Sequence, residues 1–421
     1  MPRKLSPMRY RHAAWLLALG VARSAAAQPA GGAAASPDPV VAPVDPVDPV
    51  APGAPGTPVV PVAPDPRPPV DPVAPTHPPT PLPPRELPSP GRASDPTAVA
   101  GYDHGLYLAT RDDSFRLAIS AWVQVRWELA HRGDDVDQRF SIPAGRIRLT
   151  GHAFGTTDFA LSGEGGSGAF VLRDAYLDRP LVLGARVRLG QFKPYFSRQQ
   201  LTRIIHLELT SRSVTAAFHG ITRDLGASLH REPEPEHAGI EWAVGVFDGG
   251  GIGSMRDAAG RPLAVARLGW TSAHLDGYRE GDLDGSRPGL AIAVAYAGDL
   301  GHFSADAVVH TFTADAVVKA YGLALSGAAF ARNTAEVGGR ETHYGWYAQT
   351  GYMIVPGMVE VVGRVGRTRR PGETQQEVLG GLNLYGRGGH ESKLQLEGGA
   401  TRLAGEAELD WVVRAQTQLA F

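Results

Sequence analysis

Polar and apolar residues alternate strictly over long stretches of the second part of the chain. From Leu117 to Leu129 every odd position is apolar, while the even positions include Gln124, Arg126 and Glu128. A period of two places each set on its own face of a β-strand. The run is longer than the five or six residues usual in a soluble sheet, and it suits a tilted strand that crosses a membrane.

The same alternation recurs along the rest of the chain. Ile147 and Leu149 alternate with Arg146 and Arg148, and the segment 409–421 has the same pattern. Thirteen further candidate strands lie at 157–165, 169–179, 183–193, 222–230, 238–248, 262–272, 289–298, 301–312, 314–327, 342–353, 358–368, 375–385 and 391–400. These segments predict an all-β fold, a transmembrane antiparallel β-barrel of about 16 strands, which is wide enough to enclose a water-filled channel.

The segments between the candidate strands differ in length. Gly298-Asp299 predicts a tight periplasmic turn, whereas the longer polar segments 249–261, 276–288 and 329–341 predict extracellular loops. Phe421 ends an alternating apolar strand and looks like the C-terminal recognition signal of outer-membrane barrels. We therefore expect a barrel domain at 98–421, located in the outer membrane of a Gram-negative bacterium.

The first 27 residues have the pattern of a signal peptide. A basic region that includes Arg9 and Arg11 precedes the apolar stretch 13–21, and Ala25-Ala26-Ala27 forms a cleavage site. The apolar stretch is too short to cross a bilayer as a helix. The sequence therefore predicts that residues 1–27 direct export.

Residues 28–97 differ from both neighbouring parts in their proline content. They contain 24 of the 35 prolines of the chain. Proline lacks the backbone N–H that helices and sheets require, so this segment is predicted to be an extended, polyproline-type periplasmic arm without regular secondary structure. Two interpretations are open, a disordered linker and a spacer that reaches the cell wall.

Composition and motifs exclude several classes of protein. The absence of cysteine excludes disulfides and thiolate metal sites. No Gly-Lys pair of a phosphate-binding loop occurs, the sequence around Ser167 lacks Gly-x-Ser-x-Gly, and His390-Glu391 is not followed by the second histidine of a zinc helix. We therefore expect no enzymatic activity, no cofactor and no metal site. With 41 Lys+Arg against 43 Asp+Glu, we also expect no nucleic-acid partner.

Basic residues occupy positions that face the predicted lumen. The alternation points Arg146, Arg148, Arg186 and Arg188 inward, because an Arg on the lipid face costs about 2–4 kcal/mol at mid-depth. The segment 194–221 is too basic and irregular for a lipid-facing strand, so we predict a constriction loop that folds into the pore. It supplies Arg198, Arg203 and Arg212, with Lys193 and Arg223 at its edges.

These nine residues are the predicted anion-binding site, because guanidinium groups attract anions and hold phosphate oxygens with paired hydrogen bonds. Acidic residues such as Glu128, Glu164 and Asp174 are predicted to face the same lumen. A salt-bridged lumen with weak selectivity is therefore an open alternative.

Several short motifs carry a resemblance to a known family. RDAY at 173–176, GQFKPYFS at 190–197, TRDLG at 222–226 and GVFDGG at 245–250 resemble the phosphate-selective porin O and P family. The resemblance covers roughly 115–421. It implies a sixteen-stranded outer-membrane barrel, a homotrimer, and uptake of phosphate or polyphosphate past an inward loop.

The predicted function is therefore that of an outer-membrane porin for passive diffusion of small solutes. We expect it to prefer anions such as phosphate or polyphosphate, in an Arg-lined pore constricted by loop 194–221. The expected partners are small anions, membrane lipid, further copies in a homotrimer and, for a spacer arm, the cell wall. The alternatives are a nonselective general diffusion porin and a structural barrel that anchors the Pro-rich arm.

Overall fold

The computed structural model describes residues 98–103, 105–133, 135–166, 170–232, 237–252, 262–299, 307–336, 339–370, 372–403 and 409–421. The chain divides into two units, Met1–Arg85 and Glu86–Phe421, and all described residues belong to the second. The predicted signal peptide 1–27 and the predicted Pro-rich arm 28–97 lie outside the described residues.

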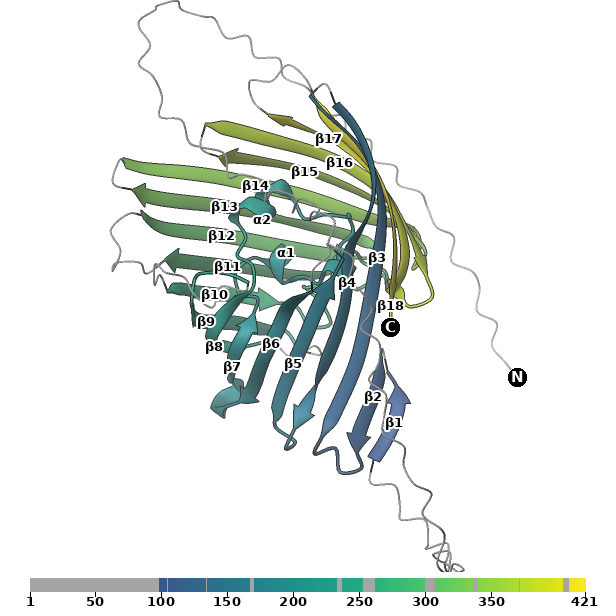
Figure 1. The fold of residues 1–421 in the computed structure, drawn as a ribbon, viewed down its shortest axis with the longest axis vertical. Helices are drawn as coiled ribbons and strands as arrows, with labels where there is room; N and C mark the ends of the chain where they lie inside the picture. The colour runs from purple at the N-terminus through teal and green to yellow at the C-terminus, as the bar shows by residue number, and fades with distance from the viewer. Residues whose placement is uncertain are drawn as a thin grey trace, which may run out of the picture. The chain divides into compact units, whose positions relative to one another are not determined.

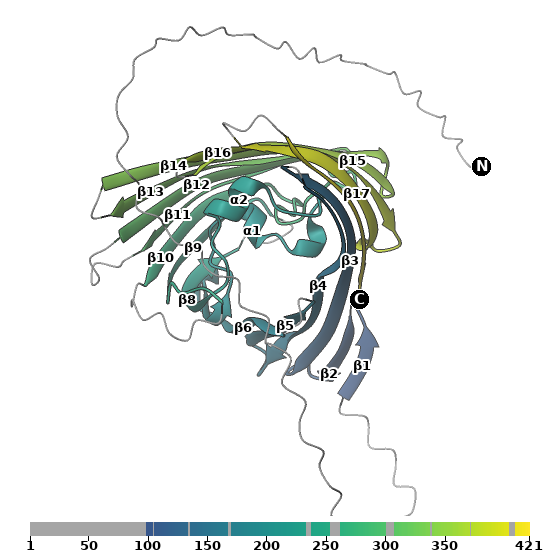
Figure 2. The same cartoon turned by 45° about the horizontal axis from the view of Figure 1, so that its top comes forward.

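Sixteen antiparallel strands close into a barrel, as the sequence predicts (Figures 1 and 2). The strands are β3 (Arg116–Arg132), β4 (Asp135–Ala153), β5 (Thr157–Gly165), β6 (Val171–Pro180), β7 (Arg186–Phe192), β8 (Asp224–Arg231), β9 (Gly239–Phe247), β10 (Leu263–Thr271), β11 (Gly289–Asp299), β12 (Ala307–Ala320), β13 (Leu323–Glu336), β14 (Gly339–Val355), β15 (Val359–Arg370), β16 (Glu373–Gly386), β17 (Gly389–Leu403) and β18 (Asp410–Ala420). Each pairs with the next, and β18 closes the ring by pairing with β3 from Trp411↔His131 to Ala420↔Trp122.

The two faces of the wall have the polarity expected of a barrel in lipid. On β3, Val123 and Val125 are each 41% exposed on the outer face, whereas Gln124 is 1% exposed and points inward. On β14, Trp346 and Tyr352 are exposed outside, while the intervening inward positions are buried. The predicted alternation, apolar outside and polar inside, is confirmed.

Two strands that the alternation did not predict precede the barrel. β1 (Ala98–Tyr102) and β2 (Leu106–Thr110) form a hairpin, and β2 pairs with the first residues of β3, from Leu106↔Ile119 to Ala109↔Arg116. The backbone of Phe421 exchanges two hydrogen bonds with Ala121, of 2.8 and 2.9 Å. One edge of β3 is therefore shared, with β18 along most of its length and β2 at its beginning.

One pair of predicted strands was misplaced. The candidates 301–312 and 314–327 imply a turn near residue 313, but β12 continues through that position and turns at Tyr321-Gly322, where both residues have positive φ (53° and 88°). Asp315, next to the expected turn, is a buried, inward-facing residue of β12 that forms ion pairs with Arg198 and with Arg267 on β10.

The connections define two ends of the barrel, and part of their predicted placement was wrong. At the turn end, which also carries Phe421, the connections include 154–156, 181–185, 321–322, 356–358 and 387–388. The segment 272–288 also joins its strands at this end, opposite to 249–261, with which the sequence grouped it. At the other end, the loop end, β11 runs through the predicted turn Gly298-Asp299, and the predicted loop 329–341 is mostly strand.

Helices contribute little to the described part of the chain, and none of them is both long enough and apolar enough to span a bilayer.

Candidate functional site

The connection between β7 and β8 folds into the barrel. This inserted loop, residues 193–223, contains α1 (Arg198–Leu201), the short 3-10 helix η2 (Ile204–His206) and α2 (Val214–His219). Ser213 caps α2 by accepting a hydrogen bond from the Ala216 amide through its Oγ, at 3.0 Å. Figures 1 and 2 show α1 and α2 inside the ring of strands. The predicted inward-folded loop is therefore present.

The inserted loop packs against one side of the lumen. Backbone carbonyls of the loop accept hydrogen bonds from inward side chains of the late strands, from Asn383 to Glu208 (2.8 Å) and from Gln418 to Ile205 (3.1 Å). Thr215 in α2 donates its hydroxyl to the Arg367 carbonyl at 3.1 Å. The loop packs against inward side chains from β9 to β18 and leaves free space next to β3–β7.

Charged groups in the filled part are paired with one another. Arg198 contacts Asp315 at 2.7 Å and Glu241 at 3.5 Å, and Arg267 contacts Asp315 at 2.8 Å. All four side chains are buried. This cluster therefore fastens the loop to the wall and offers no charge to a solute.

A cavity of about 400 Å³ lies between the inserted loop and strands β3–β7. We call it the basic cavity. Its basic lining residues are Arg146, Arg148, Arg173, Arg188, Lys193, Arg203, Arg212 and Arg223, and its acidic ones are Glu164 and Asp174. Because eight basic side chains face two carboxylates, the cavity carries a strong positive potential.

Half of these basic groups have carboxylate partners. Arg146 and Arg173 both pair with Glu164. Arg223 contacts Asp174 at 2.7 Å. Arg188 contacts Asp178 at 2.6 Å, just outside the cavity lining.

The other four basic residues form no ion pair with a carboxylate of the described residues. Lys193 and Arg212 both donate to the Thr202 carbonyl, at 3.2 and 2.8 Å. Arg148 and Arg203 form no ion pair with any described residue, and Arg203 lies 5.2 Å from the centre of the Trp122 ring. Two guanidinium groups in this cavity are therefore free to accept an anion.

The electrostatics of the inserted loop reflect this excess of positive charge. Burial, together with nearby Arg148 and Arg146, lowers the pKa of Arg203 to about 10. Burial and the charges of Arg212 and Arg223 hold the pKa of Lys193 well below its ordinary value. An anion in the cavity would relieve this repulsion.

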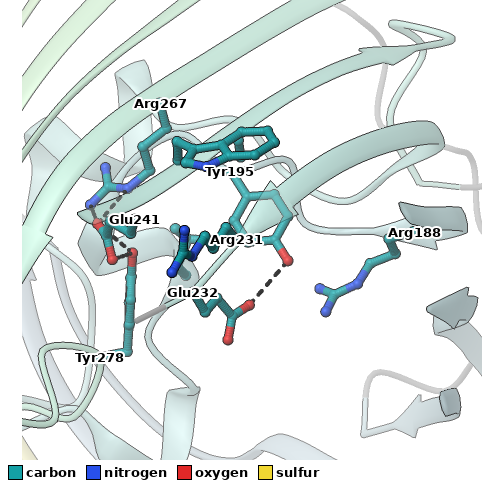
Figure 3. A pocket seen from close by; sticks show the side chains of 10 residues that line it. Arg188, Tyr195, Arg231, Glu232, Glu241, Arg267 and Tyr278 are labelled. Atoms are coloured by element: carbon teal, nitrogen blue, oxygen red, sulfur yellow. Dashed lines mark hydrogen bonds and ion pairs between the residues drawn. The ribbon is translucent and has the colours of Figure 1, made fainter. Parts of the chain in front are cut away.

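A second, smaller cavity of about 240 Å³ continues toward the turn end (Figure 3). Arg188 and Leu201 line both cavities. In Figure 3, Arg188 lies at one side, and the Tyr195 hydroxyl donates to Glu232 at 3.2 Å. Arg231, which pairs with no carboxylate in the described part of the chain, adds a basic group near the end of β8. We call this space the lower cavity.

Seven of the nine residues predicted for the anion site meet in the basic cavity: Arg146, Arg148, Arg188, Lys193, Arg203, Arg212 and Arg223. Arg198 does not, because it belongs to the buried cluster with Asp315. Arg186 does not line it either, since it pairs with Asp158 and Asp178 closer to the turn end.

The alternation missed Arg173 because of a bulge. β5 and β6 pair Ser162 with Asp174 and then Gly163 with Leu172, so Arg173 is the extra residue. A bulge breaks the period of two, and here both Arg173 and its neighbour Asp174 reach the cavity. The family-like motif at 173–176 includes Arg173, but the alternation alone gives no sign that it reaches the lumen.

Within the described ranges, no group of three or more metal-ligating side chains could hold a metal ion.

Comparison with known proteins agrees with this geometry. The profile of one family, phosphate-selective porin O and P, matches residues 121–388. No curated protein matches the chain.

Among solved structures, an anion-selective porin from Comamonas acidovorans has a TM-score of 0.52 at 14% identity, over 72% of this chain and 99% of that one. The outer membrane channel DcaP of Acinetobacter baumannii has a TM-score of 0.50 at 12% identity, over 77% and 100%. OprB of Pseudomonas putida has a TM-score of 0.52 at 11% identity, over 72% and 94%.

Proposed function

Because the chain belongs to the phosphate-selective porin O and P family and is an outer-membrane channel of a Gram-negative bacterium, we propose that it conducts small anions. The proposed path enters the basic cavity at the loop end, passes Arg188, and leaves through the lower cavity at the turn end. It is passive and needs neither a catalytic residue nor a cofactor. We also propose that the channel assembles as a homotrimer, as the family resemblance implies.

One observation carries the proposal: eight basic side chains and two carboxylates line the basic cavity, and Arg148 and Arg203 form no ion pair in the described part of the chain. Guanidinium groups hold phosphate and carboxylate oxygens with paired hydrogen bonds. The remaining bases are partly neutralised by carboxylates or donate to loop carbonyls. Several moderate sites let an anion enter without trapping it, as conduction requires.

The substrate class we propose is inorganic phosphate and small anions of similar size. A cavity of about 400 Å³ accommodates a hydrated anion between the loop and the wall. Trp122 contacts both Arg203 and Arg146, with ring-to-guanidinium distances of 5.2 and 5.1 Å. Both guanidinium groups therefore lie over the same aromatic ring.

A nonselective diffusion porin is the second candidate. The ion pairs of Arg146, Arg173, Arg188 and Arg223 favour it, because each paired carboxylate cancels part of the attraction for anions. The two candidates differ in the measured ratio of chloride to potassium permeability.

The test is the reversal potential in a salt gradient across a planar bilayer. For Arg203→Ala and Arg148→Ala we expect a lower chloride-to-potassium ratio, since removing one charge from a wetted site weakens the attraction by about 1 kcal/mol, or roughly five-fold in occupancy. Arg179→Ala is the matched control, because Arg179 is an exposed arginine on β6 that does not line the cavity. Added phosphate should block chloride current in the wild type and less so in Arg203→Ala. Equal permeabilities in the wild type would favour the nonselective porin.

A further inference from the structure

The turn end of the barrel carries one connection that is far longer than a turn. Residues 272–288 join β10 to β11, whereas connections such as 321–322 and 387–388 join their strands with two residues. We infer that this segment, which we call the brace, is a second constriction element that holds the inserted loop in position from the opposite end of the barrel. The inference rests on the proposed function, because it concerns the shape of the same path.

Glu280 makes three hydrogen bonds between the brace and the inserted loop, and Arg198 of the loop donates another to the Gly277 carbonyl of the brace at 3.1 Å. Its amide donates to the His206 carbonyl at 3.1 Å. Its carboxylate accepts hydrogen bonds from the Glu208 amide at 2.8 Å and from the Gln199 side chain at 3.2 Å. These contacts bracket Arg203 in sequence, so Glu280 fixes the part of the loop that carries the unpaired guanidinium group.

The brace is itself fastened to the wall. The Lys319 ammonium on β12 donates to the carbonyls of Asp276 (3.0 Å) and Arg279 (2.7 Å). The Asp282 carboxylate accepts from the Gly322 amide at 2.7 Å in the turn between β12 and β13. A continuous chain of polar contacts therefore leads from the wall through the brace to the inserted loop.

The backbone of the brace is shaped for this close approach. Gly281, next to Glu280, has φ +76°, a conformation that favours glycine. A Cβ built on Gly281 would lie 2.9 Å from Glu360 Oε1 on the wall. Any larger residue at position 281 would therefore adopt a strained φ and would have to displace the Glu360 carboxylate.

The brace also contributes to the lining of the path. Tyr278 lines the lower cavity, and its hydroxyl donates to Glu241 at 2.9 Å, beside the contact of Arg267 with the same carboxylate (Figure 3). The inserted loop contributes Tyr195 and Leu201 to the same cavity. Both inserted segments therefore bound the space through which a solute would leave.

The experiment compares four variants with the wild type in single-channel recordings. Glu280→Ala removes the acceptor of the loop contacts, and Glu280→Gln keeps a carbonyl oxygen that can still accept from the Glu208 amide. Asp284→Ala is the control within the brace, since that side chain is 82% exposed and contacts only Arg279 among the ion pairs of the described residues. In the fourth variant, Asn-Gly replaces residues 273–289, because Ser272 and Leu290 already pair across the hairpin.

We expect Glu280→Ala and the Asn-Gly replacement to increase current fluctuations, to raise conductance by about two-fold or more, and to lower the chloride-to-potassium ratio, because a freed loop no longer defines the path. Glu280→Gln should restore most of the wild-type behaviour, and Asp284→Ala should be unchanged. A heat-dependent shift in gel migration identifies folded barrels. If Glu280→Ala does not fold, the comparison of the Asn-Gly replacement with the wild type decides.

The inference would be wrong if folded Glu280→Ala and the Asn-Gly replacement had the same noise, conductance and ion ratio as the wild type. The result for the brace can be distinguished from the result for the proposed function. A wild-type channel without anion preference would contradict the proposed function, whereas noise and conductance would still report on the brace.

Discussion

Two arginines of the inserted loop show how surroundings decide what a residue does. Arg198 lies in a buried cluster with Asp315 and Glu241, and its ion pairs hold the loop in position. Arg203, five positions later, faces the basic cavity and pairs with no described carboxylate. The sequence assigned both to the anion site. Asp315 is 117 positions from Arg198, and only the closed barrel brings the two together.

Lys193 should make anion preference depend on pH. Burial and two neighbouring arginines hold its pKa well below 10.5. An anion favours the protonated amine, so affinity is greatest below that pKa and falls as pH rises through it. We expect the chloride-to-potassium ratio, measured from pH 6 upward, to decrease well before pH 10.5, where an ordinary lysine titrates.

The control for this prediction is Lys193→Met, which keeps the length of the side chain and cannot titrate. Its ion ratio should be lower than that of the wild type at pH 6 and flat across the range. A slope equal to that of the wild type would assign the pH dependence to another group.

Glu208 should make the seating of the loop depend on pH. Burial, with Glu360 and Glu280 nearby, holds its pKa well above the ordinary value of 4.5. Its folded-state pKa is raised, so its contribution to stability is complete below 4.5 and is lost as pH rises through the raised value. We expect the thermal midpoint of the barrel to fall with rising pH, and Glu208→Gln to reduce that slope. An equal slope in Glu208→Gln would contradict this.

At the scale of elements, the strands could be predicted from the sequence. Of the two inserted segments, the inserted loop was predicted and the brace was placed at the wrong end. β5 spans 157–165, as the alternation predicts, because both faces of a wall strand have a fixed environment. The inserted loop was recognisable because its basic, irregular sequence could not face lipid. The brace was assigned to the wrong end because its length and polarity were taken as the mark of an extracellular loop, whereas it joins β10 and β11 at the turn end.

Gly351 on β14 gives a test of how closely the inserted loop packs on the wall. A Cβ at this position would lie 2.0 Å from Glu208 Oε1 and 2.8 Å from Glu360 Oε1. Gly351→Ala must therefore displace both carboxyl groups, and we expect a loss of about 1–3 kcal/mol of stability, as in other overpacked sites.

The matched control for this prediction is Gly363→Ala on the adjacent β15, because its Cβ would meet nothing nearer than the Leu379 carbonyl at 4.0 Å. The midpoint of thermal unfolding measures both variants. Equal midpoints for the two variants would show that the loop yields without strain.

At the scale of the whole barrel, the β1–β2 hairpin protects an edge. β18 pairs with β3 only as far as Trp122, and β2 pairs with Arg116 to Ile119. Without the hairpin, these first residues of β3 would present unpaired backbone groups at the rim, which readily pair with another chain.

We therefore expect a variant that lacks residues 98–110 to fold as a barrel but to self-associate in detergent beyond the state of the wild type. Light scattering coupled to size-exclusion chromatography measures this difference. The same mass for both proteins would show that the exposed edge is harmless.

The inserted loop packs against β9–β18 and the basic cavity lies against β3–β7, so different parts of the chain form the support and the lining. The early strands supply the surface that a solute contacts, and the late strands support the inserted loop and fix its position. A designer could therefore rewrite the inward positions of β4 to β7 to change what the pore admits while leaving the support intact. Substitutions in the late strands, by contrast, would weaken the ion selectivity without changing any residue that contacts the solute.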